Sequence, residues 1–82
     1  MTDPIRAILK EHGRLSVDAH SLADDANLYE AGMTSHASVN VMLALEAQFD
    51  CEFPEQMFRR EVFGSIAGLR AAIEQLTDGR DP

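Results

Sequence analysis

The segment from Ser35 to Phe49, SHASVNVMLALEAQF, constrains the fold more than any other part of the chain. It contains no glycine or proline, the two residues that most destabilise a helix interior. Four of its apolar residues recur at helical spacing and share one face: Val41, Met42, Leu45 and Phe49. The segment therefore predicts a helix over 35–49, with that face in a core and with Thr34 or Ser35 as its N-cap.

The N-terminal part predicts a helix over residues 4–12. Asp3 suits the cap of this helix and Pro4 suits its first position. Gly13 then predicts a left-handed cap at its end. Residues 14–34 show no sustained period, so they predict a long loop.

Scattered apolar residues in this loop indicate that it lies across the helices, held by Leu22 and Leu28. Gly32 predicts a turn just before the next helix.

Two more helices are predicted toward the C-terminus. Residues 54–61, PEQMFRRE, begin with a proline and suit a short helix. Ser65 suits the cap of a helix that continues to about residue 76, and the tail 77–82 is polar and expected to be frayed. Together these segments predict an all-α bundle of three long helices and one short helix.

Length and charge limit the function. Eighty-two residues make a single domain, 1–82, with a modest core and little room for a catalytic cleft, which favours a binding or carrying module. Fourteen acidic against seven basic side chains give a formal charge of −7. Such a surface repels phosphate backbones, so nucleic acid is not expected as a partner.

Location and assembly follow from what the sequence lacks. Cys51 is the single cysteine, so neither an intrachain disulfide nor a cysteine-based metal cluster is expected. No apolar run reaches the roughly 18 residues of a membrane span, and the first residues do not resemble a signal peptide. We therefore expect a cytoplasmic monomer with no membrane partner.

Four ordered motifs resemble those of the acyl carrier protein family, the phosphopantetheine-binding or thiolation domains. LYEAG at residues 28–32 leads to Ser35, which lies three residues after the glycine. LEAQFD at 45–50 is followed by Phe53-Pro54, and SIAGL at 65–69 begins the last helix. The resemblance covers nearly the whole chain, including the first helix and the long loop.

The resemblance implies that Ser35 receives a 4'-phosphopantetheine arm from coenzyme A through a separate phosphopantetheinyl transferase. The thiol of the arm then holds acyl or aminoacyl cargo as a thioester, so the protein is not itself an enzyme. The start of a helix suits this attachment, because unpaired N–H groups and the helix dipole favour a phosphodiester anion there.

The chain departs from the family pattern next to the serine. Thr34 replaces the usual aspartate and His36 replaces the usual leucine, while Ala37, Asn40 and Ala47 stand where the fatty-acid type often has acids. These departures make the chain similar to small bacterial carriers that class II aminoacyl-tRNA-synthetase-like ligases charge with amino acids. Carriers of fatty acids, polyketides, nonribosomal peptides or special lipids remain open alternatives.

The expected partners are the transferase, a cargo-loading ligase and a downstream acceptor enzyme. Val39 and Leu43 lie four residues apart on a second stripe of the central helix, either as core or as an apolar strip for a partner. The patch Met57-Phe58-Arg59-Arg60 is unusual on an acidic domain: it suits either a short amphipathic helix with a solvated basic end or a docking site near the arm. The candidate partner-binding residues are Thr34, His36, Val39, Asn40, Leu43, Arg59 and Arg60.

Two rival functions are considered. A helical adaptor would bind a partner through Val39 and Leu43 and carry nothing. A small esterase would use Ser35 with His36, but adjacent helical residues point in different directions and no nucleophile elbow is present. The spacing of His12, His20 and His36 matches no zinc signature, so no metal is expected.

Overall fold

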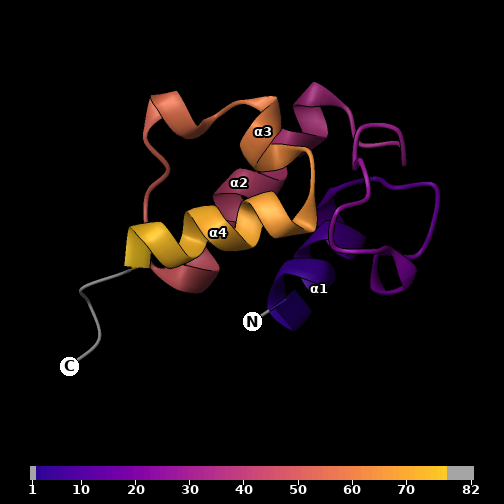
Figure 1. The fold of residues 1–82 in the computed structure, drawn as a ribbon, viewed down its shortest axis with the longest axis horizontal. Helices are drawn as coiled ribbons and strands as arrows, with labels where there is room; N and C mark the ends of the chain where they lie inside the picture. Colours follow the sequence, from indigo (N-terminus) through magenta and orange to yellow (C-terminus); the bar gives the residue numbers. More distant parts are fainter. Residues whose placement is uncertain (1, 78–82) are drawn as a thin grey trace.

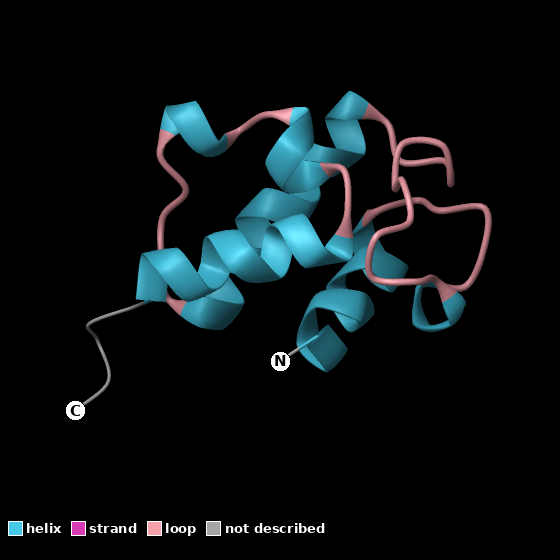
Figure 2. Ribbon diagram, viewed as in Figure 1, coloured by secondary structure: helices cyan, strands magenta, loops and turns pink. Residues whose placement is uncertain are grey.

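The computed structural model describes residues 2–77 and contains four α-helices in that range (Figure 1). They are α1 (Thr2–His12), α2 (Ser35–Phe49), α3 (Arg60–Phe63) and α4 (Ile66–Thr77). Two 3-10 turns lie at Ala19–Ser21 and Glu55–Met57, and the described part of the chain has no strand (Figure 2). The predicted all-α bundle of three long helices and one short helix is confirmed.

The three long helices enclose the core. α1 packs on α2 and α4, and α3 packs on α4. Val41 and Leu45 of α2 are fully buried, as their spacing predicted, whereas Met42 and Phe49 are partly buried at the edge of the core. The fully buried apolar side chains of the other three helices are Ile5, Leu9, Phe63, Ile66, Leu69 and Ile73.

The long loop lies against the helices, as its apolar residues predicted. Leu28 is fully buried and Leu22 partly buried. Arg6 of α1 also holds the loop: its Nη1 donates to the carbonyl oxygens of Ala19 and Leu22 at 2.8 and 2.6 Å, and its Nη2 donates to Asp24 Oδ1 at 2.5 Å. A cationic side chain on the first helix therefore satisfies backbone groups of the loop, a role that local sequence patterns do not reveal.

α1 ends at His12 as predicted, but its start and the cap after its end differ from the prediction. The helix begins at Thr2, so Asp3 lies in its first turn instead of capping it. The left-handed residue after the helix is Arg14, with φ 55°, and the prediction for Gly13 was wrong. Gly13 is required for a different reason, because a Cβ there would lie 2.8 Å from the carbonyl oxygen of Leu9.

The short helix predicted over 54–61 was also wrong in its bounds. Residues 55–57 form a 3-10 turn, and the chain is then extended at Arg59, with φ −148° and ψ 167°, before α3 begins. Ring contacts accompany this bend, since Phe58 meets the buried Phe63 edge-on at 5.1 Å between centroids. This aromatic contact accompanies the break at Arg59, where the sequence predicted a continuous helix.

The last helix begins as predicted. Ser65 Oγ accepts from the backbone N–H of Gly68 at 3.0 Å, which caps α4. Thr77 belongs to α4, so placing it in a frayed tail was wrong, and the rest of that predicted tail, 78–82, lies outside the described residues.

Candidate functional site

Ser35 is the first residue of α2, and its side chain is exposed. Thr34 is the N-cap, with extended backbone, and its Oγ1 accepts from the N–H of Ala37 at 3.0 Å. Of the two predicted caps, the structure therefore selects Thr34. The exposed Ser35 therefore does not serve as the cap of the helix that it begins.

The chain that leads to Ser35 is fixed by contacts on both sides. Gly32 adopts φ 119°, as the predicted turn requires, and a Cβ there would lie 3.0 Å from the backbone nitrogen of Ser16. The carbonyl oxygen of Ala31 accepts from both the N–H and the Oγ of Ser16, at 2.8 and 2.9 Å. Met33 is buried, so the entry into α2 is anchored in the core.

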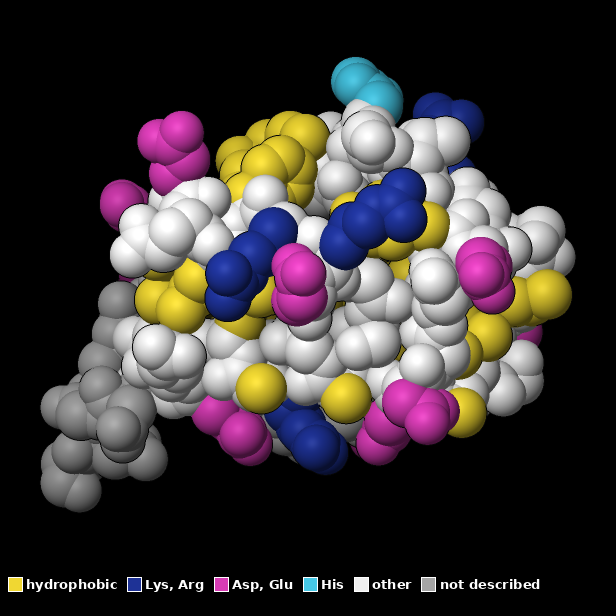
Figure 3. Space-filling model, turned by 45° about the horizontal axis from the view of Figure 1, so that its top comes forward, with side chains coloured by type: hydrophobic (Ala, Val, Ile, Leu, Met, Phe, Trp, Pro, Cys, Tyr) yellow, Lys and Arg dark blue, Asp and Glu magenta, His cyan; other side chains and the backbone are white. Residues whose placement is uncertain are grey.

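A groove of about 200 Å³ lies beside Ser35. Its lining residues come from the lead-in turn, α2, the segment before α3 and the first residue of α3: Tyr29, Ser35, Ser38, Phe58, Arg59 and Arg60. The Arg60 guanidinium lies over the Tyr29 ring, 5.1 Å from its centroid. Figure 3 turns the top of Figure 1 forward and shows basic side chains beside exposed apolar ones on this face.

The structure thus brings Arg59 and Arg60 to the predicted attachment residue. Sequence reasoning missed Tyr29 and Ser38 as lining residues and named Phe58 only as part of the patch at 57–60. Phe58 carried a weak signal as an apolar residue beside two arginines. Tyr29 belongs to the family lead-in motif, but its place opposite Arg60 depends on the tertiary fold.

The outer face of α2 carries the other predicted partner residues. Leu43 is 54% exposed, a large fraction for an apolar side chain, and His36 is also exposed. Val39 and Asn40 are half-buried. The apolar stripe of Val39 and Leu43 is therefore exposed at Leu43 and half-buried at Val39.

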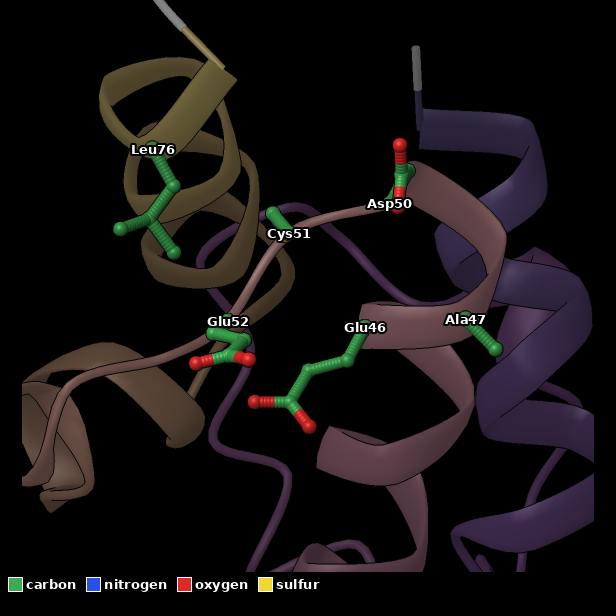
Figure 4. A pocket seen from close by; sticks show the side chains of 6 residues that line it. All are labelled: Glu46, Ala47, Asp50, Cys51, Glu52 and Leu76. Atoms are coloured by element: carbon green, nitrogen blue, oxygen red, sulfur yellow. The ribbon is translucent and has the colours of Figure 1, made fainter.

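A second, wider hollow of about 630 Å³ lies at the far end of α2, about 20 Å along the helix from Ser35 (Figure 4). Glu46, Asp50 and Glu52 are among its lining residues. Glu46 Oε2 accepts from the N–H of Phe53 at 2.8 Å, and Asp50 is the left-handed C-cap. These contacts turn the chain after α2. The C-terminal end of α2 therefore has a structural role.

Neither a metal centre nor a membrane span is found in the described residues. Among residues 2–77, His, Cys, Asp and Glu side chains do not gather in threes as metal ligands would. None of the helices described in that range is both long and apolar enough to cross a bilayer.

Replacing Thr34 with alanine is expected to lower the free energy of unfolding by about 1 kcal/mol, because the N–H of Ala37 loses its capping acceptor. Urea denaturation followed by circular dichroism measures the change. Thr34→Ser keeps the hydroxyl and should stay within about 0.5 kcal/mol of the parent. Equal losses in the two variants would contradict the capping role.

Comparison with known families shows to which family the chain belongs. A model described as the phosphopantetheine attachment site matches residues 4–75. The chain belongs to this phosphopantetheine-binding family. Members of the family carry 4'-phosphopantetheine as their covalent cofactor.

Aminoacyl carrier proteins are among the relatives of this phosphopantetheine-binding chain. The aminoacyl carrier protein of Agrobacterium fabrum is 40% identical, over 99% of this chain and 98% of the relative. Aminoacyl carrier protein 2 of Bradyrhizobium diazoefficiens is 30% identical, over 92% of this chain and 81% of the relative. The family assignment thus extends to the stand-alone aminoacyl carriers.

Solved structures agree with this assignment. A carrier protein from Agrobacterium tumefaciens, solved with an engineered Bradyrhizobium japonicum glycine:[carrier protein] ligase and AMP, matches with a TM-score of 0.86. The match is 40% identical and covers 90% of this chain and 99% of that one. A glycylated carrier protein in complex with the B. japonicum ligase matches with a TM-score of 0.74 at 28% identity, over 87% and 95% of the two chains.

The residues around Ser35 fit a phosphopantetheine group. The Ser35 hydroxyl is exposed and borders a groove that also contains two arginines, the side chains suited to a phosphodiester anion. In place of the aspartate usual in the family, Thr34 provides the capping bond without adding a negative charge next to Ser35.

Proposed function

We propose that this protein carries an amino acid as a thioester on a 4'-phosphopantetheine arm attached to Ser35, and presents it to partner enzymes. The observation that carries the proposal is the exposed Ser35 hydroxyl at the first position of α2. A transferase that holds coenzyme A needs such access. The protein itself supplies no catalytic group and acts as a carrier.

Attachment forms one bond and breaks one. Ser35 Oγ attacks the phosphorus of coenzyme A that bears the pantetheine, and adenosine 3',5'-bisphosphate leaves. The serine proton passes to a base of the transferase. The attached group then supplies the thiol that forms the thioester with the cargo.

The residues of α2 stabilise the resulting phosphodiester. The first N–H groups of a helix have no acceptor within the helix. In α2 the N–H of Ala37 already donates to Thr34 Oγ1. The N–H groups of Ser35 and His36 therefore face the position of the anion at the positive end of the helix dipole.

The relatives support an amino acid as cargo. They are named aminoacyl carrier proteins, and one solved relative is glycylated and bound to a glycine:[carrier protein] ligase. We therefore assign three partner classes to this chain: a phosphopantetheinyl transferase, a ligase related to class II aminoacyl-tRNA synthetases, and a downstream acceptor enzyme. Fatty-acid, polyketide and peptide carriers would share the arm and differ in the ligase.

Intact-protein mass spectrometry tests the proposal. Incubation with coenzyme A and a broad-range phosphopantetheinyl transferase should add the mass of one phosphopantetheine, and peptide mapping should place it on Ser35. Further incubation with a glycine:[carrier protein] ligase, ATP and glycine should add one glycyl group. A protein that folds normally but gains no arm would support the adaptor hypothesis and overturn the carrier.

The exposed part of α2 is proposed as the ligase contact, so replacing Leu43 with aspartate should slow loading. Leu43 is 54% exposed on the helix that begins at Ser35, and an interface apolar anchor of this kind contributes on the order of 1–2 kcal/mol. We expect kcat/KM for loading to fall about tenfold.

Val17→Asp is the matched control for this experiment. Val17 is 49% exposed but lies in the loop between α1 and the first 3-10 turn, away from α2 in the chain. Its replacement should leave the loading rate within about twofold. Equal losses in the two variants would show that the added charge, and not the α2 surface, affects the ligase.

A further inference from the structure

We propose that the groove beside Ser35 binds the proximal part of the carrier's own arm, its phosphodiester and geminal dimethyl group, and leaves the thiol end outside. This inference rests on the proposed attachment at Ser35. It adds an intramolecular binding site, formed by Tyr29, Phe58, Arg59 and Arg60, to a protein otherwise regarded as a passive tether.

The point of attachment is part of the groove itself. Ser35 lines it together with the two arginines, so a phosphodiester on Ser35 Oγ begins its path inside the groove. Tethering replaces a bimolecular encounter with a high effective concentration, so even weak contacts are occupied for much of the time. The arm is therefore the occupant that this groove is best placed to hold.

The charge of the groove matches the first group of the arm. Arg59 and Arg60 are two of only seven basic side chains on a chain of formal charge −7. The Tyr29 ring, 5.1 Å from the Arg60 guanidinium, limits where that side chain can lie. A planar guanidinium donates paired hydrogen bonds to phosphate oxygens. Arg59 Nε lies 3.9 Å from Glu61 Oε1, so we assign the phosphodiester chiefly to Arg60.

The apolar wall of the groove matches the next group of the arm. Phe58 is 42% exposed, although its ring is held edge-on against the buried Phe63 at 5.1 Å and 84°. Phe63 in turn contacts Phe53, with centroids 5.2 Å apart. The ring is thus preoriented and still open on one side, where a branched dimethyl group covers apolar surface at little entropic cost.

The size and charge of the groove exclude the thiol end of the arm and its cargo. The groove volume of about 200 Å³ lies below the range of roughly 300–1,000 Å³ typical of small-molecule pockets, so it accommodates a fragment and not the whole loaded arm. The ammonium group of an aminoacyl thioester would also be repelled by two guanidinium groups. The thiol and its cargo therefore remain outside, accessible to partner enzymes.

Nuclear magnetic resonance of the arm-bearing protein tests the proposal. Comparison of ¹H–¹⁵N spectra before and after modification should show shifts at Tyr29, Phe58 and Arg60, with nuclear Overhauser contacts between the dimethyl protons and the Phe58 ring. Glycine loading should leave these amide positions unchanged. Arg60→Gln should weaken the Overhauser contacts at least twofold. Lys10→Gln removes the same charge from an exposed residue of α1 and should retain these contacts.

The outcomes separate this proposal from the carrier function. Failure to gain the arm, seen first by mass, would overturn the attachment on which both rest. A modified protein with neither the shifts nor the Overhauser contacts would overturn the groove alone and leave the carrier intact. Groove amides that move only on glycine loading would show that the cargo end binds there, which contradicts the assignment.

Discussion

Ser35→Ala is expected to stay at its unmodified mass after incubation with coenzyme A and a phosphopantetheinyl transferase under conditions that convert the parent protein completely. Thr34 and Ser35 are both exposed hydroxyl residues at the start of α2, but Thr34 Oγ1 caps the helix by accepting from the N–H of Ala37. Because the variant has no oxygen there to attack phosphorus, we expect more than a hundredfold loss of modification, measured by intact mass.

Ser16→Ala is the matched control. Ser16 is also an exposed serine, and its Oγ donates to the carbonyl oxygen of Ala31 near the lead-in turn, so the variant perturbs the surroundings of Ser35 without removing its oxygen. It should be modified fully. Ser35→Ala should also fold normally, since alanine has a high helix propensity and Thr34 still caps α2. Arm uptake by a folded Ser35→Ala protein would place the attachment elsewhere.

The parts of the site that sequence patterns predicted are local. The helix from Ser35 to Phe49 lacks breakers, has a core face and follows a threonine that suits the cap, and the structure reproduces both of its bounds. Gly32 supplies the predicted turn with φ 119°. Each of these features depends on interactions within a few residues, which periodicity and capping preferences describe directly.

The parts that sequence patterns missed depend on distant segments. The groove exists because the segment carrying Phe58 and Arg60 bends toward Tyr29, which belongs to the lead-in turn. The short helix was wrongly extended over 54–61 because Pro54 is a good helix start and PEQMFRRE contains no breaker after it. The aromatic contact between Phe58 and Phe63 outweighs that local preference, and no pattern within the segment indicates it.

The outer face of α2 differs in charge from the rest of the surface. The outer face of α2 exposes Leu43 and has half-buried Asn40, while acidic Glu46 is turned to the backbone of Phe53. A partner that docks along this helix therefore meets an apolar and neutral surface near Ser35. The net charge of −7 is carried mostly elsewhere, where it speeds encounter more than it sets affinity.

Arg6→Ala is expected to destabilise the fold by about 2–4 kcal/mol, a large part of the roughly 5–15 kcal/mol typical of small domains. The Arg6 side chain is only 12% exposed and donates to the carbonyl oxygens of Ala19 and Leu22 and to Asp24. Alanine leaves these acceptors without their donor and releases the loop that leads toward Ser35. Urea denaturation should show a lower midpoint with an unchanged m-value.

Arg70→Ala separates the role of hydrogen bonding from that of charge. Arg70 also approaches Asp24, but at 4.0 Å and with a side chain that is 41% exposed, so the solvent screens most of the attraction. Its loss should cost less than about 0.5 kcal/mol. Because both variants remove one positive charge near the same carboxylate, equal destabilisation would mean that electrostatics hold the loop. A much larger loss for Arg6→Ala would show that its bonds to the loop carbonyls hold the loop, and with it the chain that leads to Ser35.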